Sequence, residues 1–295
     1  MSRSAGRASV ILATLVLVPC LFATPPLPGW NTPDGARQLV RLAVSNELEH
    51  EHDRFQFRLT VRKPGAVQAK ESVETDDGTV ARLVSLNGQP LTPQQQAAEN
   101  ARLAKLLSDP QSWAKKQKEQ QEDDARTQRL LQALPDAFLF QYEGVEPGRW
   151  GELVRLKFSP DPNYSPPSRE MQVFQGMQGE MWIDAGDFHL VRIDGTLFKG
   201  VNFGWGILGH LDAGGHFFVE QSKLDSQRWD VTHMKLDFTG KALFLFKINI
   251  HEDVSASHYQ PVPQHLTLQG GIELLEKPEE TRTAGDGAHA SHGPR

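Results

Sequence analysis

The sequence predicts an α+β fold that is mainly antiparallel β-sheet, with an N-terminal helix and a helical insertion. Apolar and polar residues alternate in short runs along most of the chain, as they do from Phe55 to Arg62. This period of two is typical of strands with one buried face. Only a few residues separate successive runs, which favours neighbouring antiparallel hairpins over parallel strands joined by helices.

The first 23 residues are typical of a cleavable secretory signal peptide. Arg3 and Arg7 precede an apolar run over residues 10–23, which is shorter than the roughly 20 residues that span a bilayer. We expect cleavage near Ala23 and a periplasmic mature protein, with an uncleaved anchor helix as the alternative. Cys20 follows a proline where a lipidation site has a small residue, and its lipidation stays open.

Charge and cysteine usage exclude several classes of function. Loss of the signal peptide changes the formal charge from −6 to −8, and a mildly acidic chain lacks the basic surface of a nucleic-acid-binding protein. The mature chain has no cysteine, so we expect neither disulfides nor a thiolate nucleophile. No later stretch is apolar enough for a spanning helix.

The first half of the mature chain combines a helix, three strands and the insertion. Apolar residues at helical spacing predict a helix over 34–50, and period-two runs predict strands around 55–61, 67–75 and 79–86. Asp76-Asp77-Gly78 is a hairpin signal between the last two. Residues 93–134 are rich in Gln, Lys, Glu and Ala and predict two helices that break near Asp109-Pro110. We interpret them as a solvated insertion, with a partner-binding coiled coil as the alternative.

The second half is predicted to be a meander of strands. Turn residues are expected at Ala185–Asp187, Asp212–Gly215 and Gly240-Lys241. The tail, 277–295, is polar and predicted to be disordered, which leaves 24–276 as a single β-rich domain. The expected strands are 138–142, 153–158, 179–184, 189–198, 200–206, 216–221, 229–238 and 242–251.

The number of strands bears on the shape of the sheet. About eleven strands span roughly 50 Å, whereas one helix covers only about 10 Å of that width. The sheet must therefore close into a barrel, stack as two layers, or curve into a half-barrel that keeps an apolar cavity.

Two adjacent segments carry a resemblance to a known family. Gly179-Glu-Met-Trp-Ile-Asp184 is followed by His189-Leu-Val-Arg-Ile-Asp194, and with the order of elements over residues 34–255 they resemble the periplasmic lipoprotein-carrier superfamily. That superfamily includes lipoprotein-sorting carriers and a lipoprotein-sensing anti-sigma-factor regulator. The resemblance implies a curved open sheet, or half-barrel, whose hydrophobic cavity takes acyl chains. The insertion at 93–134 departs from the compact family pattern and leaves the cover of the cavity open.

Aromatic residues on the predicted strands are the candidates for lining such a cavity, although ordinary core packing and sheet bulges explain the same residues. No cofactor or metal is expected, because the two histidines of His50-Glu-His52-Asp53 do not share a helix face. The pairs Glu220 with Asp237 and His233 with Asp230 lack any accompanying catalytic motif. The cavity candidates are Trp182, Phe203, Trp205, Phe217, Phe218 and Trp229.

These observations favour a non-enzymatic periplasmic carrier or sensor that binds lipid or the acyl chains of a lipoprotein. One alternative is an envelope scaffold that binds a protein partner through the 93–134 helices. A second alternative is an exported hydrolase.

Overall fold

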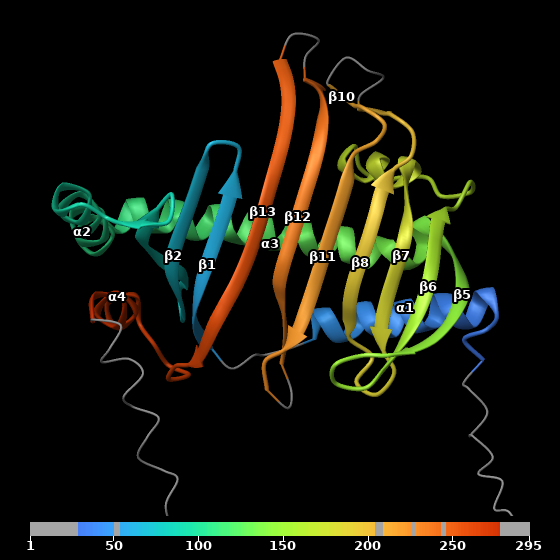
Figure 1. Cartoon of the computed structure of the whole chain (residues 1–295), viewed down its shortest axis with the longest axis horizontal. Helices are drawn as coiled ribbons and strands as arrows, with labels where there is room; N and C mark the ends of the chain where they lie inside the picture. The colour runs from blue at the N-terminus through green and yellow to red at the C-terminus, as the bar shows by residue number, and fades with distance from the viewer. Residues whose placement is uncertain (1–28, 50–53, 204–208, 226–227, 243–245, 278–295) are drawn as a thin grey trace, which may run out of the picture.

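The computed structural model describes residues 29–49, 54–203, 209–225, 228–242 and 246–277. Helices and strands are numbered as in Figure 1. The helices are α1 (Pro33–Leu48), α2 (Pro93–Ser108), α3 (Pro110–Ala137), the 3-10 helix η1 (Glu170–Gly176) and α4 (Leu268–Glu276). The strands are β1 (Phe55–Lys63), β2 (Ala66–Thr75), β3 (Gly78–Leu86), β4 (Gln89–Pro90), β5 (Phe138–Pro147), β6 (Glu152–Pro160), β7 (Met177–Asp184), β8 (Leu190–Leu197), β9 (Val201–Phe203), β10 (Gly209–Leu211), β11 (His216–Lys223), β12 (Trp229–Ala242) and β13 (Phe246–Pro261).

The strands form one open antiparallel sheet (Figure 1). The order is β4-β3-β2-β1-β13-β12-β11-β8-β7-β6-β5, and the short β9 and β10 pair with each other beside β12. The first and last strands of the chain meet at the centre, where β1 pairs with β13. The sheet is therefore neither a closed barrel nor two stacked layers, and the predicted curved open sheet is confirmed.

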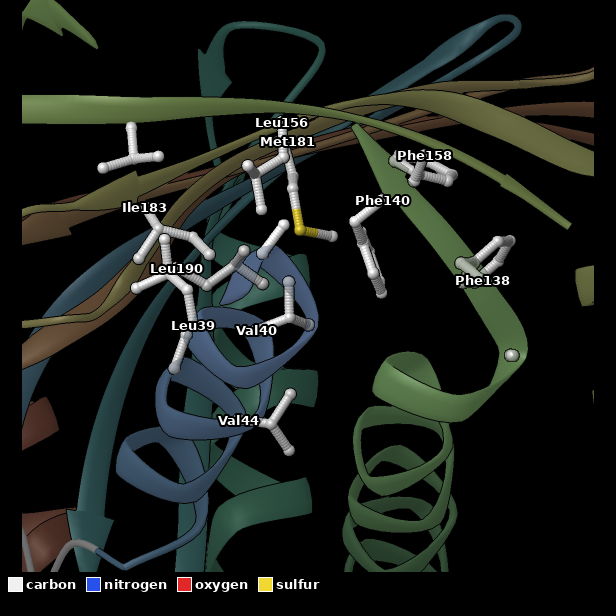
Figure 2. Packing of buried hydrophobic residues seen from close by; sticks show 14 of the residues in the cluster. Leu39, Val40, Val44, Phe138, Phe140, Leu156, Phe158, Met181, Ile183 and Leu190 are labelled. Carbon is white, nitrogen blue, oxygen red and sulfur yellow. The ribbon is translucent and has the colours of Figure 1, made fainter. Parts of the chain in front are cut away.

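One end of the sheet, strands β5 to β8, is covered by α1, and we call this part the α1 wing (Figure 2). Thr32 caps the helix by accepting a hydrogen bond from the Gly35 backbone N–H at 3.1 Å, and Pro33 occupies its first position. Leu39 and Val40 pack on Leu156 and Met181 of the strands, and all four side chains are at most 2% exposed. This wing has a filled core.

The opposite end of the sheet, β2 and β3 with α2 and α4, is the α4 wing. Val73 and Val80 are fully buried with Ile272 and Leu275 of α4. Gly271 lets α4 approach closely, because a Cβ atom there would lie 2.7 Å from Thr75 Cγ2. This wing also has a filled core.

The long helix α3 joins the two wings (Figure 1). Its start packs in the α4 wing through Trp113, and its end packs in the α1 wing through Ala137. Gln120 also exchanges two hydrogen bonds with the Thr79 backbone. A helix of 28 residues is about 42 Å long, which is enough to pass across the four strands between the wings.

The structure confirms most of the predicted elements and corrects others. The helix at the N-terminal end, the 76–78 hairpin and the break at Asp109-Pro110 are confirmed. The predicted turn at Gly240-Lys241 is wrong, because β12 continues to Ala242, which pairs directly with Phe246. The expectation of a simple meander misses the pairing of β1 with β13, and neither α4 nor η1 is among the elements predicted from the sequence.

Candidate functional site

A single row of side chains crosses the sheet on the side that carries α1. Directly opposed residues point to the same face of an antiparallel sheet, so the row can be followed through the strand register. It starts in the buried core of the α1 wing and continues over the middle of the sheet towards β2. From β6 to β2 the row is Leu156, Met181, Ile193, Val219, Met234, Val254, Val61 and Gln68.

The middle of this row belongs to an apolar surface that is partly open to solvent. Leu156 and Met181 are at most 1% exposed, but the residues on β11, β12, β13 and β1 are half-buried, and Ile250 is 37% exposed. We call this surface the central face. It consists of Phe57, Leu59, Val61, Val219, Met234, Leu236, Ile248, Ile250 and Val254.

The central face lies open because neither helix on its side seals it. α1 has 16 residues, about 24 Å, and is used on the α1 wing. The helix α3 packs mainly on α1, α2, η1 and β5. From Gln121 to Arg129 every side chain of α3 except Ala125 is exposed, so this stretch passes across the strands without being seated on them.

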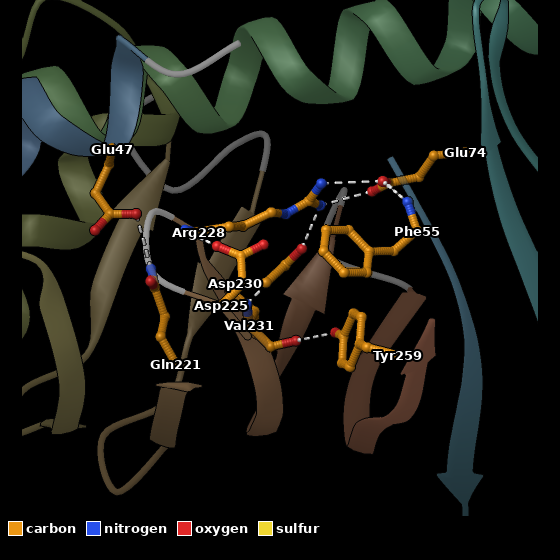
Figure 3. A network of polar contacts seen from close by, with 9 residues as sticks. All are labelled: Glu47, Phe55, Glu74, Gln221, Asp225, Arg228, Asp230, Val231 and Tyr259. Carbon is orange, nitrogen blue, oxygen red and sulfur yellow. Dashed lines mark hydrogen bonds and ion pairs between the residues drawn. The ribbon is translucent and has the colours of Figure 1, made fainter. Parts of the chain in front are cut away.

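A polar network lies on the same side of the sheet, at the end of the central face near the start of β1 (Figure 3). The Arg228 side chain is 8% exposed, and its Nη2 donates to Glu74 Oε1 at 2.8 Å and to Asp230 Oδ2 at 2.6 Å. Its guanidinium also stacks 4.9 Å from the Phe55 ring centre. Burial disfavours the charged guanidinium, but the two carboxylates outweigh it and raise the pKa of Arg228.

Tyr259 joins this network to the apolar side chains. A bulge in β13, where His258 has φ 56°, offsets the pairing with β1. The Tyr259 ring stacks on Phe57 with 5.2 Å between ring centres, and its hydroxyl donates to the Val231 carbonyl at 3.3 Å. Burial, with the nearby Asp230 carboxylate, raises the pKa of Tyr259, so the phenol remains neutral.

The boundary between the central face and the α1 wing is also polar. Glu47, in the last turn of α1, accepts hydrogen bonds from the Leu190 backbone N–H at 3.1 Å and from Gln221 Nε2 at 2.9 Å. The same carboxylate lies 3.2 Å from His189 Nδ1. These bonds anchor the C-terminal end of α1 between β8 and β11.

The structure describes five of the six predicted cavity residues and does not bring these five together. Phe217 faces the helices and packs at the border of the α1 wing. Trp182 and Phe218 lie on the opposite face, where the Arg192 guanidinium stacks on both rings. Phe203 packs near β9 and β10, Trp229 stacks on His189 at the start of β12, and Trp205 lies outside the described residues.

The acidic and histidine side chains that were set aside for lack of a catalytic motif each have another partner. Glu220 pairs with Arg192 at 2.7 Å, and Asp237 pairs with His251 at 2.8 Å. His233 lies 3.3 Å from Asp253. Asp230 pairs with Arg228. Except for the last, these are cross-strand pairs on the polar outer face of the sheet, a common way to stabilise neighbouring strands.

The residues that the structure describes lack two features. They contain no group of three or more His, Cys, Asp or Glu side chains placed to hold a metal ion. Within the same residues, no helix combines the length and apolar character needed to cross a membrane. Residues 1–23, for which a signal peptide is predicted, the His50–Asp53 stretch and residues 278–295 of the tail lie outside the described part of the chain.

Comparison with known proteins gives similarities in fold. No family model and no curated protein sequence matches the chain. A LolA superfamily protein from Nitrosomonas europaea has 10% identity and a TM-score of 0.26, and the match covers 77% of this chain and 94% of that one. A putative outer membrane lipoprotein-sorting protein domain from Vibrio parahaemolyticus has 10% identity, a TM-score of 0.30 and coverage of 82% and 100%. A DUF1329 family protein from Desulfovibrio piger has 11% identity, a TM-score of 0.29 and coverage of 81% and 98%. At these identities and TM-scores the similarities concern the fold alone.

Proposed function

We propose that this protein is an exported, non-enzymatic binding protein that holds the acyl chains of a lipid or lipoprotein on its central face. The observation that carries the proposal is the central face itself, a set of mostly half-buried apolar side chains on the same side of the sheet as the filled core of the α1 wing. Continuous exposed apolar surface in a water-soluble domain commonly marks a binding site.

The physical driving force is the transfer of hydrocarbon from water to this surface. Each methylene that is buried contributes about 0.8 kcal/mol, so binding strength should increase with acyl-chain length. From Gln121 to Arg129 the side chains of α3, Ala125 excepted, are exposed and do not seal the central face. The Arg228 network lies near the start of β1 and Lys63 at its end, and the Glu252 partner of Lys63, at 2.5 Å, lies on the same face of β13 between Val254 and Ile250.

The export part of the proposal comes from the sequence of residues 1–23. A periplasmic location would give the central face access to envelope lipids. The alternative functions are an envelope scaffold and an exported hydrolase, and one experiment distinguishes them from acyl-chain binding.

The test is displacement of a fluorescent fatty-acid probe from the purified mature chain, together with native mass spectrometry of co-purified lipid. Met234→Gln combined with Val254→Thr makes the centre of the face polar with little change in volume, and should weaken probe binding about tenfold. Lys235→Gln is the matched control, because Lys235 is exposed on the opposite face of the same strand.

Three results would overturn the proposal. A lipid-free protein that does not bind the probe contradicts it, and supports a scaffold if protein-partner binding is lost on deletion of residues 97–129. Turnover of a generic ester panel that a single Glu or His substitution abolishes supports a hydrolase. Equal weakening by Lys235→Gln would show that the probe binds elsewhere.

A further inference from the structure

The insertion helices form a basic pocket at one margin of the central face. Lys70 of β2, Arg102 of α2 and Lys116 of α3 line a hollow of about 300 Å³. Lys70 lies directly opposite Leu59 on β1, on the same face of the sheet. Gln68, which ends the apolar row described above, lines the same hollow. The pocket and the central face are therefore continuous.

One acidic residue lies in the pocket, and its hydrogen bonds are directed elsewhere. The two oxygens of Glu99 accept bonds from the Arg102 guanidinium at 2.7 and 2.8 Å. Its Oε1 also accepts the Leu83 backbone N–H at 2.8 Å. Arg102 in turn donates to the Ala81 carbonyl at 2.5 Å. Glu99 and Arg102 thus satisfy each other and the free edge of β3.

The two lysines are left without a carboxylate partner. Among the described residues, neither Lys70 nor Lys116 forms an ion pair, although Lys116 lies 5.5 Å from the centre of the Trp113 ring. Burial lowers the pKa of Lys116, the positive charges of Arg102 and Lys70 lower it further, and the negative charge of Glu99 offsets these effects only in part. A negatively charged group in the pocket would relieve this repulsion.

We infer that this pocket binds the phosphate of a lipid headgroup while the acyl chains of the same lipid lie on the central face. The inference rests on the proposed function and specifies its ligand class. Lysine ammonium groups are common phosphate ligands, and their positive charge complements an anionic headgroup.

The dimensions agree with a single lipid whose headgroup lies in the basic pocket and whose acyl chains lie on the central face. From β2 to β11 there are four strand spacings of about 4.8 Å, which gives roughly 19 Å. One leaflet of a bilayer's hydrocarbon core is about 15 Å thick. An acyl chain can therefore extend from the pocket across the half-buried row without leaving apolar surface.

The experiment compares two lipids that differ only in the phosphate, dioctanoyl phosphatidic acid and dioctanoylglycerol, in titrations of the mature chain. We expect phosphatidic acid to bind about tenfold more tightly, and this preference to shrink as salt is added. Lys70→Gln combined with Lys116→Gln should remove the preference and leave dioctanoylglycerol affinity unchanged. Lys118→Gln is the control, because Lys118 is 77% exposed on the same helix.

The possible results distinguish a failure of the phosphate site from a failure of the proposed acyl-chain binding. Equal affinity for the two lipids, or a preference that survives the double substitution, overturns the phosphate site and leaves acyl-chain binding intact. Inorganic phosphate that binds as tightly as the lipid shows a site for a free anion and overturns the lipid headgroup. Failure of both lipids to bind overturns the proposed function and this inference together.

Discussion

The α1 wing and the central face share one row of side chains but differ in their cover. Leu156 and Val254 belong to the same row, and both are apolar strand residues. Leu156 is fully buried beneath α1, whereas Val254 is half-buried beside an exposed stretch of α3. The comparison shows that helix placement, and not strand sequence, decides which apolar residues become core and which remain available for binding.

The largest effect should come from the polar network beside the central face. Arg228→Met leaves Glu74 and Asp230 close together without their cation, and removing one partner of a buried ion network costs about 3–5 kcal/mol. Urea denaturation measures the loss. Arg62→Met is the control, because the Arg62–Asp253 pair is exposed and should contribute under about 1 kcal/mol. Equal losses of unfolding free energy in Arg228→Met and Arg62→Met would show that the Arg228 network does not stabilise the middle of the sheet.

Matched leucine truncations test the comparison directly. Leu156→Ala creates a cavity in a filled core and should cost about 3 kcal/mol of unfolding free energy. Leu59→Ala removes the same atoms from a surface open to solvent and should cost roughly 1–2 kcal/mol. Leu59→Ala should also weaken lipid binding, and Leu156→Ala should not. The distinction between wing and face fails if the two losses are equal.

The α4 wing offers a smaller test of close packing. Gly271→Ala places a methyl group 2.7 Å from Thr75 Cγ2 and 3.1 Å from Val80 Cγ1, so the helix must move away from the sheet. Such overpacking costs about 1–3 kcal/mol. Gly270→Ala is the neighbouring control, since the nearest atom there is the end of the Leu266 side chain. Thermal unfolding of both variants should rank Gly271→Ala as the less stable.

The smallest effect concerns pH and the basic pocket. Burial raises the pKa of Glu99, but hydrogen bonds from Arg102 and the Leu83 N–H outweigh burial and lower it overall. A carboxyl with a lowered pKa stabilises the fold above its unfolded pKa, and this stability is lost as pH falls through the folded pKa. Glu99→Gln should cost about 1 kcal/mol at neutral pH. The difference from the unsubstituted chain should shrink as pH falls from the unfolded pKa through the lower folded pKa, and a pH-independent difference would contradict the assignment.

Local patterns in the sequence were sufficient for most elements but not for the site. The break at Asp109-Pro110 and the hairpin at 76–78 have signals within a few residues. The helix α4, which was not predicted, has such signals too, in its Thr267 cap and in the spacing of Leu268, Ile272 and Leu275.

The candidate site depends on pairings between distant segments. Nothing in the β1 sequence indicates that Val61 lies beside Val254. Lys70 and Lys116 are likewise brought together only by the fold. The described aromatic residues that were predicted to line a cavity lie on both faces of the sheet. Strand alternation shows which residues share a face, but it does not show which face the helices cover.

The two margins of the sheet have a consequence for behaviour at high protein concentration. β5 carries a bulge at Gly144, where φ is +134°, and ends at Pro147. At the other margin β4 has only two residues, one of them Pro90, and Glu99 and Arg102 occupy the free backbone groups of β3. Neither margin offers a long straight row of unpaired amides for another chain to join. We therefore expect the protein to resist edge-to-edge polymerisation even while it presents an apolar surface.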